Sequence, residues 1–308
     1  MTGSARARAV DAATLTFVTC VRGKDDVAAA RLLLESLRAF GGDLGGRPVW
    51  VFAEPGMREA AETLSAPRLD VLPLRVPPVL AGFPFATTVV ACAEAEDRAA
   101  SAASLVWIDP KCLVVRPPLL FHLADDVDVA VRPVHVRNVG SPAEAPVDDY
   151  WRRIYEDVGV DDVGLTVESF VDGQRLRAYF NSHAQAVRPS LGIFRRRCEH
   201  FERLATDRRF LAGACRDEVH RAFLFQALFS ALVAALVVPA RVRVLPPDYV
   251  YPYNLHADVP DQRRAAALDD LACVVVEGRS VRPDGVTDIA VREPLRSWLA
   301  ARAPGPLG

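Results

Sequence analysis

The chain has 308 residues, of which 51% are hydrophobic and 25% charged, and its formal net charge is −2. This composition is typical of a globular protein, and a chain of this length buries roughly three quarters of its unfolded surface. The near-neutral charge, without a block of Lys or Arg, argues against nucleic acid as a partner.

The cysteines and the apolar segments bear on the cellular environment. Among the six cysteines there is no Cys-x-x-Cys pair, so we expect buried, reduced thiols and no structural zinc site. Residues 1–13 lack the apolar core of a secretory signal, so we expect a flexible N-terminus and a cytoplasmic protein. The apolar segment 222–238 is shorter than the roughly 20 residues that a bilayer requires. It is better explained as a buried core helix than as a transmembrane segment.

Strands and helices alternate along the first half of the chain. Apolar, β-rich runs predict strands at 15–21, 49–53, 69–74 and 105–108, and helical spacing predicts helices at about 27–40, 57–64 and 87–103. Asp25 or Asp26 can cap the first helix, and Gly41-Gly42 ends it. The alternation predicts an α/β fold with a mostly parallel central sheet and helices on both faces.

The second half of the chain is less regular. We predict strands at 112–115, 127–131, 242–245 and 273–276, and helices at 147–157, 191–204 and 217–238. Residues 138–178 are more polar and less periodic, so we interpret them as an insertion beside the site. We therefore expect one domain over 14–299, followed by a C-terminal tail at 300–308.

The carboxyl ends of the predicted strands identify the candidate site, because ligands of parallel α/β sheets bind beyond these ends. The loop 19–26 follows the first strand, and Asp109 and Lys111 follow the strand at 105–108. Two residues apart on an extended chain, Asp109 and Lys111 would share a face. The sequence has neither a Gly-x-Gly-x-x-Gly fingerprint after the first strand nor a Gly-x-Ser-x-Gly motif, which disfavours dinucleotide-binding and hydrolase functions.

Four segments, in this order, resemble the GT-A nucleotide-sugar glycosyltransferases, particularly the retaining group that includes glycogenin and bacterial galactosyltransferases. They are Phe17–Val21, Leu105–Val114, Tyr179–Arg188, and Leu245–Tyr249 with the aromatic loop that follows. The second stands where the family has its Asp-x-Asp motif, and the third is similar to its Phe-Asn-(Ser/Ala)-Gly stretch. The resemblance implies a GT-A fold. It also implies transfer of a sugar, with retained stereochemistry, from a nucleoside-diphosphate sugar to an acceptor.

The Asp-x-Asp motif is degenerate in this chain. In the family, two carboxylates hold a divalent cation that neutralises the diphosphate leaving group. Here Asp109 keeps the first position, but Lys111 takes the second, and its ammonium would repel a nearby metal. Mg²⁺ or Mn²⁺ is therefore disfavoured, with Asp109 as the one candidate ligand. We hypothesise that Lys111 takes the place of the metal against the diphosphate; the alternative is a solvated loop lysine.

The resemblance also assigns roles to individual residues. The candidate catalytic residues are Asp109, Lys111, Asn181, His183, Asp217 and Glu218; the candidate nucleotide-binding residues are Thr19, Cys20, Val21, Arg22 and Asp109; the candidate substrate-binding residues are Ser182, Tyr251 and His256.

Each of these assignments has a structural alternative. His183 is either a general base or simply hydrogen-bonded in a turn, which Asn181 can cap. Asp217 and Glu218 either face the sugar or stabilise a helix N-terminus. Tyr251 and His256 either line the pocket or pack on the core.

A sugar transferase that binds a small molecule, a nucleotide sugar, is the leading functional hypothesis. The first alternative is a GT-A scaffold repurposed for non-glycosyl small-molecule chemistry in specialised biosynthesis, which the degenerate motif favours because fold does not imply function. The second alternative is a non-catalytic binding protein.

Overall fold

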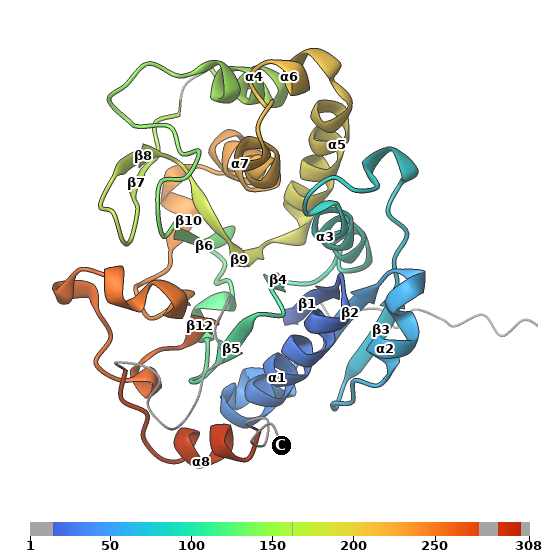
Figure 1. Ribbon diagram of the computed structural model, residues 1–308, viewed down its shortest axis with the longest axis vertical. Helices are drawn as coiled ribbons and strands as arrows, with labels where there is room; N and C mark the ends of the chain where they lie inside the picture. The colour runs from blue at the N-terminus through green and yellow to red at the C-terminus, as the bar shows by residue number, and fades with distance from the viewer. Residues whose placement is uncertain (1–14, 162, 277–288, 303–308) are drawn as a thin grey trace, which may run out of the picture.

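The computed structural model describes residues 15–161, 163–276 and 289–302. The predicted flexible N-terminus (1–13) and residues 303–308 of the predicted tail lie outside the described residues. At the centre is a seven-stranded sheet (Figure 1). Its strands, in spatial order, are β10 (Val242–Val244), β6 (Val129–Pro133), β9 (Phe180–Val187), β4 (Ser104–Ile108), β1 (Leu15–Val21), β2 (Val49–Ala53) and β3 (Leu69–Pro73).

The sheet is mostly parallel, as predicted. β1 pairs in parallel with β2 and β4, β2 with β3, and β6 with β10. Only β9 runs antiparallel, against both β4 and β6. One expectation was wrong here: His183 does not lie in a turn capped by Asn181, because Asn181, Ser182 and His183 belong to β9, directly after its first residue Phe180. Because β9 runs in the opposite direction, its first residues lie beside the carboxyl end of β4.

Alternate side chains of the strands pack against helices on opposite faces of the sheet. Phe52 and Trp107 belong to the core on the side of α3, α5 and α7, whereas Val51 and Val106 belong to the core on the side of α1 and α2. Figure 1 shows α1 and α3 on opposite sides of the strands. The helices are α1 (Lys24–Phe40), α2 (Arg58–Glu62), α3 (Ala86–Arg98), α4 (Asp149–Val158), α5 (Ile193–Thr206), α6 (Arg208–Ala212), α7 (Glu218–Leu236) and α8 (Leu295–Ala300). The predicted two-sided helical cover is therefore confirmed.

Two smaller sheets complete the described structure. β5 (Cys112–Val114) continues the chain after β4 and joins β12 (Cys273–Val275) and β11 (Tyr251–Pro252). The segment 138–178 contains α4 and a two-stranded sheet of β7 (Thr166–Glu168) and β8 (Arg175–Arg177).

Helix α7 is the apolar segment that resembles a membrane span in composition. Among the described residues, one helix is long and apolar enough to cross a membrane, and 56% of its apolar window is buried inside the protein. Residues 224–233 are all buried, and the helix packs on α4, α5 and β9. This packing supports the core-helix interpretation.

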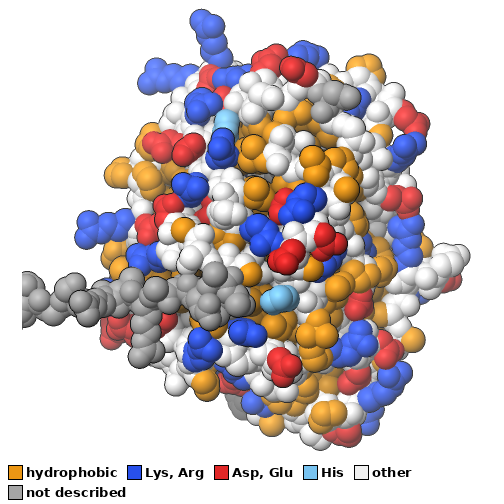
Figure 2. Space-filling model, turned by 180° about the vertical axis from the view of Figure 1, so that it is seen from behind, with side chains coloured by type: hydrophobic (Ala, Val, Ile, Leu, Met, Phe, Trp, Pro, Cys, Tyr) orange, Lys and Arg blue, Asp and Glu red, His pale blue; other side chains and the backbone are white. Residues whose placement is uncertain are grey.

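The mixture of charges on the surface and the burial of the cysteines agree with what the composition predicts. The face in Figure 2 carries acidic and basic side chains intermixed with hydrophobic ones, without a large patch of one charge. All six cysteines are free and five are buried, while Cys198 is half-buried.

Asp128, which precedes β6, connects the ends of β9 and β10, the two strands that flank β6. Its carboxylate accepts hydrogen bonds from Arg241 Nε at 2.6 Å, just before β10, and from Arg188 Nε at 3.2 Å, just after β9. The hydrogen bond from Arg241 is the largest influence on Asp128 and, with the charges of both arginines, it lowers the pKa of this carboxyl below its usual value.

We expect Asp128→Asn to lower the free energy of unfolding by about 1 kcal/mol at neutral pH, because it removes charge-assisted hydrogen bonds. A carboxyl whose folded-state pKa is depressed stabilises the protein above the unfolded-state value, which is about 4. That stabilisation is lost as the pH falls through the folded-state pKa. Urea unfolding of both proteins should therefore show a difference that is full at neutral pH and shrinks below about pH 4. A difference independent of pH would contradict this role.

Candidate active site

A cavity of about 310 Å³ lies where β1, β4 and β6 end and β9 begins. Its polar lining includes Arg22, Asp109, Lys111, His135, Asn181 and His183, and its apolar lining includes Phe85, Val134, Phe223 and Phe225. Parallel strands bring their carboxyl ends to one edge of the sheet, and the antiparallel β9 adds its first residues to the same edge. Segments far apart in the sequence therefore share one cavity.

Arg22 is held between two carboxylates. It directly follows β1 and is separated by Gly23 from α1, whose first turn contains Asp26. Arg22 Nε donates to Asp26 Oδ2 at 2.7 Å, and Arg22 Nη1 lies 3.1 Å from Asp109 Oδ2. Burial disfavours the charge on Arg22, but the hydrogen bond to Asp26 and the charge of Asp109 outweigh it and raise the Arg22 pKa. The guanidinium therefore stays charged and connects the ends of β1 and β4.

Asp109 also shapes the turn after β4. Its Oδ1 accepts a hydrogen bond of 3.0 Å from the backbone N–H of Lys111, and its own N–H donates to His183 O at 2.7 Å. The first contact fixes the backbone that carries Lys111, and the second continues the pairing of β4 with β9. Both Asp109 and Lys111 line the cavity, as their spacing predicts.

The residues around Asp109 do not fit a divalent cation. Both of its carboxylate oxygens are engaged, by Arg22 and by the Lys111 N–H. Across the described ranges, no three or more His, Cys, Asp or Glu side chains are grouped closely enough to hold a metal ion. A divalent cation at Asp109 would have to displace the guanidinium that already pairs with Asp109 and Asp26.

Asn181 orients two histidines. Its Oδ1 accepts from the His183 backbone N–H at 2.8 Å, so Oδ1 must also accept from His183 Nδ1, 2.9 Å away. His135 Nε2 lies 2.7 Å from the carbonyl of Val250, which can only accept, so this nitrogen carries a proton. Asn181 Nδ2 lies 3.4 Å from His135 Nδ1. The side-chain oxygen of Asn181 thus holds the ring proton of His183 on Nδ1. Nε2 is then the ring nitrogen of His183 that can accept a further proton.

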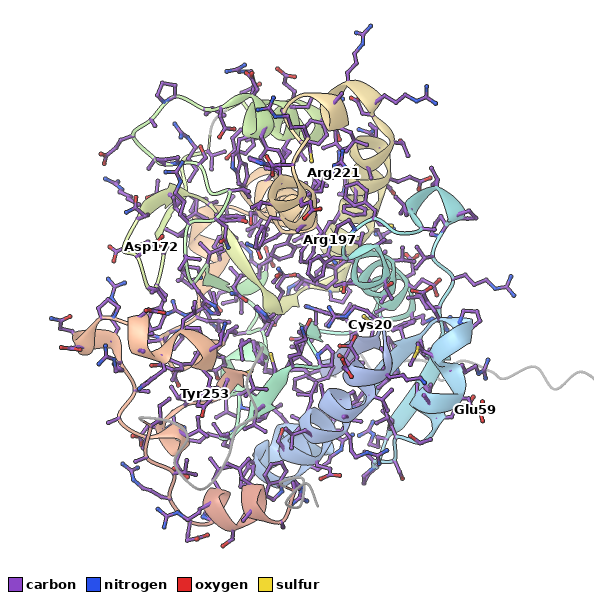
Figure 3. All side chains as sticks on the ribbon, in the orientation of Figure 1. Cys20, Glu59, Asp172, Arg197, Arg221 and Tyr253 are labelled. Atoms are coloured by element: carbon purple, nitrogen blue, oxygen red, sulfur yellow. The ribbon has the colours of Figure 1, made fainter. Side chains whose placement is uncertain are left out.

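The remaining nucleotide-binding candidates lie under the cavity. Thr19, Cys20 and Val21 are fully buried within β1 and do not line it, so Arg22 alone of the four reaches it. Cys20 contacts Thr88 of α3 at 3.7 Å near the centre of the molecule (Figure 3). Burial is the main cause of the raised pKa of the Cys20 thiol. The prediction placed these side chains in the site because it ignored that a central strand is covered on both faces.

Asp217 and Glu218 do not reach the cavity either. The Asp217 side chain caps α7 by accepting from the backbone N–H of His220 at 2.9 Å, and Glu218 occupies the first turn. The part of α7 that lines the cavity begins one turn later, at Ala222. The structural alternative therefore explains these carboxylates.

Ser182, Tyr251 and His256 have different surroundings. Ser182 lines the cavity, and its carbonyl accepts from Trp107 Nε1 at 2.8 Å. Tyr251 and His256 are buried outside the cavity, where the Tyr251 hydroxyl lies 2.7 Å from His256 Nδ1. Asn254 and Leu255, between them, are the residues of the aromatic loop that line the cavity.

Sequence reasoning missed three features of the lining. His135 is one. It lies just after the predicted strand 127–131, so the rule that candidates follow strand ends could have identified it. Phe85 is another: its backbone has a φ of 61° and its ring stacks on Phe225 at 4.4 Å. Such a backbone conformation is unfavourable for a bulky residue and is concentrated at functional sites. The third is Gln226, which α7 brings to the cavity by tertiary packing alone.

The histidine arrangement predicts a measurable tautomer. Long-range ¹H–¹⁵N NMR spectra should show a proton on Nδ1 of His183 and on Nε2 of His135, because each nitrogen faces an oxygen that can only accept. In Asn181→Ala, the Nδ1 proton of His183 loses its acceptor, and we expect a tautomeric mixture. Spectra of the unaltered protein in which Nδ1 of His183 carries no proton would contradict this geometry. His122, remote from Asn181 in the sequence and absent from the cavity lining, serves as an internal control.

No family model matches the sequence, and no curated protein is similar to it in sequence. Solved structures are similar in fold. The galactosyltransferase LgtC, in complex with donor and acceptor sugar analogs, matches with a TM-score of 0.53 and 15% identity over 93% of this chain and 95% of that one.

Two further solved structures are similar to this chain in fold. An active-site variant of LgtC in which glutamate replaces glutamine gives a TM-score of 0.52 and 16% identity over the same shares of the two chains. The bifunctional glycosyltransferase WbbM, in its apo form, gives 0.50 and 11% identity over 87% of this chain and 46% of that chain. The chain therefore has the fold of the GT-A glycosyltransferases, as the sequence resemblance implied.

Proposed function

We propose that the protein is a glycosyltransferase that moves a sugar from a nucleoside-diphosphate sugar to an acceptor, with cationic side chains in place of a metal. The observation that carries this proposal is the position of Arg22 and Lys111. Both line the cavity at the carboxyl edge of the sheet, beside the single carboxylate Asp109. The fold shared with LgtC, whose structure holds donor and acceptor sugar analogs, supports sugar transfer.

The cations match the charge that develops in this reaction. The bond between the anomeric carbon and a diphosphate oxygen breaks, and its electron pair leaves with the diphosphate. A fixed positive charge at the leaving group lowers the barrier because it stabilises this anion without reorganising at the moment of reaction. In our proposal Lys111 supplies that charge as an ammonium. Arg22 pairs with Asp109 and so weakens the repulsion between this carboxylate and the diphosphate.

Other residues of the same cavity provide the acceptor side in our proposal. The contact of Asn181 with Nδ1 of His183 leaves Nε2 as the atom that can receive the proton of the attacking hydroxyl. The stacked rings of Phe85 and Phe225 offer an apolar surface for the carbon face of a sugar. We assign His183 the role of base and this aromatic pair the role of positioning the sugar.

Isothermal titration with UDP-sugars and GDP-sugars tests this proposal. The sequence contains only two lysines, and the second, Lys24, is exposed and does not line the cavity. We expect Lys111→Ala to weaken nucleotide-sugar binding by about 10- to 100-fold, the effect of losing a hydrogen bond to a charged group. The matched control Lys24→Ala should leave binding unchanged.

Two results would overturn the proposal. Failure of the unaltered protein to bind any nucleotide sugar would exclude the donor. Equal binding by Lys111→Ala and the unaltered protein would exclude the role of the ammonium.

A further inference from the structure

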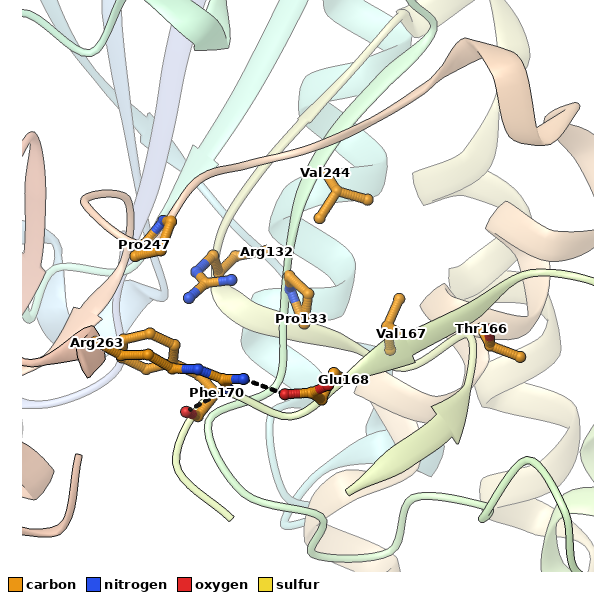
Figure 4. Close-up of a pocket in the computed structure, with 9 residues that line it drawn as sticks. All are labelled: Arg132, Pro133, Thr166, Val167, Glu168, Phe170, Val244, Pro247 and Arg263. Atoms are coloured by element: carbon orange, nitrogen blue, oxygen red, sulfur yellow. Dashed lines mark hydrogen bonds and ion pairs between the residues drawn. The ribbon is translucent and has the colours of Figure 1, made fainter. Parts of the chain in front are cut away.

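A second cavity, of about 410 Å³, adjoins the first along one segment of chain. Arg132 and Pro133, at the end of β6, line the second cavity, whereas the next three residues line the first. Its other walls come from β7, from Phe170, and from Val244, Pro247 and Arg263 (Figure 4). None of these residues belongs to the proposed transfer site.

Arg132 is buried in the wall of this cavity and is incompletely paired. Only 6% of the surface of Arg132 is exposed, and its guanidinium lies 4.5 Å from the ring centroid of Phe170. Its Nε and Nη2 are buried and form no hydrogen bond with the described part of the chain. Buried guanidinium N–H groups usually have partners, because an unsatisfied buried charge is costly. The exception points to a ligand in the cavity.

The other charges around Arg132 are compensated. Arg263 forms an ion pair with Glu168 and donates to the carbonyl of Phe170 at 3.1 Å. Asp248 pairs with Arg116 at 3.1 Å. Burial, together with the neighbouring Arg263, lowers the Arg132 pKa to about 10, so the group is still protonated at neutral pH. The cavity therefore presents the equivalent of one positive charge.

We propose that this cavity binds a small molecule through a carboxylate that pairs with Arg132. One uncompensated positive charge matches a monoanion, and the planar guanidinium matches the two oxygens of a carboxylate. Val167, Phe170, Val244 and Pro247 form apolar walls that suit the carbon body of the same ligand. The site is independent of the proposed sugar transfer.

Benzoate is a suitable probe, with benzamide as its neutral isostere and phenyl phosphate as its phosphate counterpart. Titration calorimetry should show that the unaltered protein binds benzoate about 10-fold or more tightly than benzamide, since only benzoate pairs with the charge. Phenyl phosphate should bind more weakly than benzoate. Equal affinity for benzoate and benzamide, or tighter binding of phenyl phosphate, would overturn the assignment.

Variants of Arg132 separate a binding role from a structural one. Arg132→Met should abolish the preference for benzoate and leave the urea midpoint equal or higher, because an apolar side chain replaces a buried, poorly paired charge. Arg132→Lys, which keeps the charge without the planar fork, should retain part of the preference. The control Arg152→Met changes an arginine whose side chain is 56% exposed and should alter neither quantity.

The two proposals can fail separately. Nucleotide-sugar binding should be the same in Arg132→Met and in the unaltered protein. An Arg132→Met protein that unfolds at much lower urea yet keeps the benzoate preference would show that Arg132 is structural.

Discussion

The ion pair between Arg22 and Asp109 connects the ends of β1 and β4 at the place where ligands of this fold bind. Its guanidinium also pairs with Asp26, so one side chain bridges two buried carboxylates. The pair removes Asp109 from metal binding and makes the region around Lys111 compatible with an anion. Asp109 in turn holds the backbone of Lys111 and pairs with β9, which carries Asn181 and His183. The electrostatics of the site and its geometry therefore depend on the same contact.

Most of the fold could be predicted from the sequence because central parallel strands are uniformly apolar. The predicted strands at 15–21 and 49–53 coincide with β1 and β2. The predicted helices differ from α1 to α5 and α7 only at their ends, whereas the short helices α6 and α8 were not predicted. β9 could not be predicted as a complete strand, because its first residues, Asn181 to His183, are polar and resemble a turn. They are polar because they face the cavity instead of a helix. The prediction thus failed where the sequence serves a site and not the core.

The same reasoning recovered only part of the site. Arg22, Asp109 and Lys111 were found because each follows a strand, and His183 was found through the family resemblance. Thr19 and Cys20 do not line the cavity, since the strand before such an end is buried on both faces. Phe85 directly precedes α3 and Gln226 lies within α7, and only tertiary packing brings them to the cavity. Arg132 gave no signal at all, because an arginine within an apolar strand pattern shows neither its burial nor its missing partners.

The central claim is that Arg22 and Lys111 take the place of a divalent cation. The most direct measurement is the affinity for UDP-sugar or GDP-sugar by titration calorimetry, with EDTA and then with Mn²⁺. Because the carboxylate of Asp109 is engaged by Arg22, we predict the same affinity under both conditions. Binding by the unaltered protein that disappears in EDTA and returns with Mn²⁺ would contradict the account.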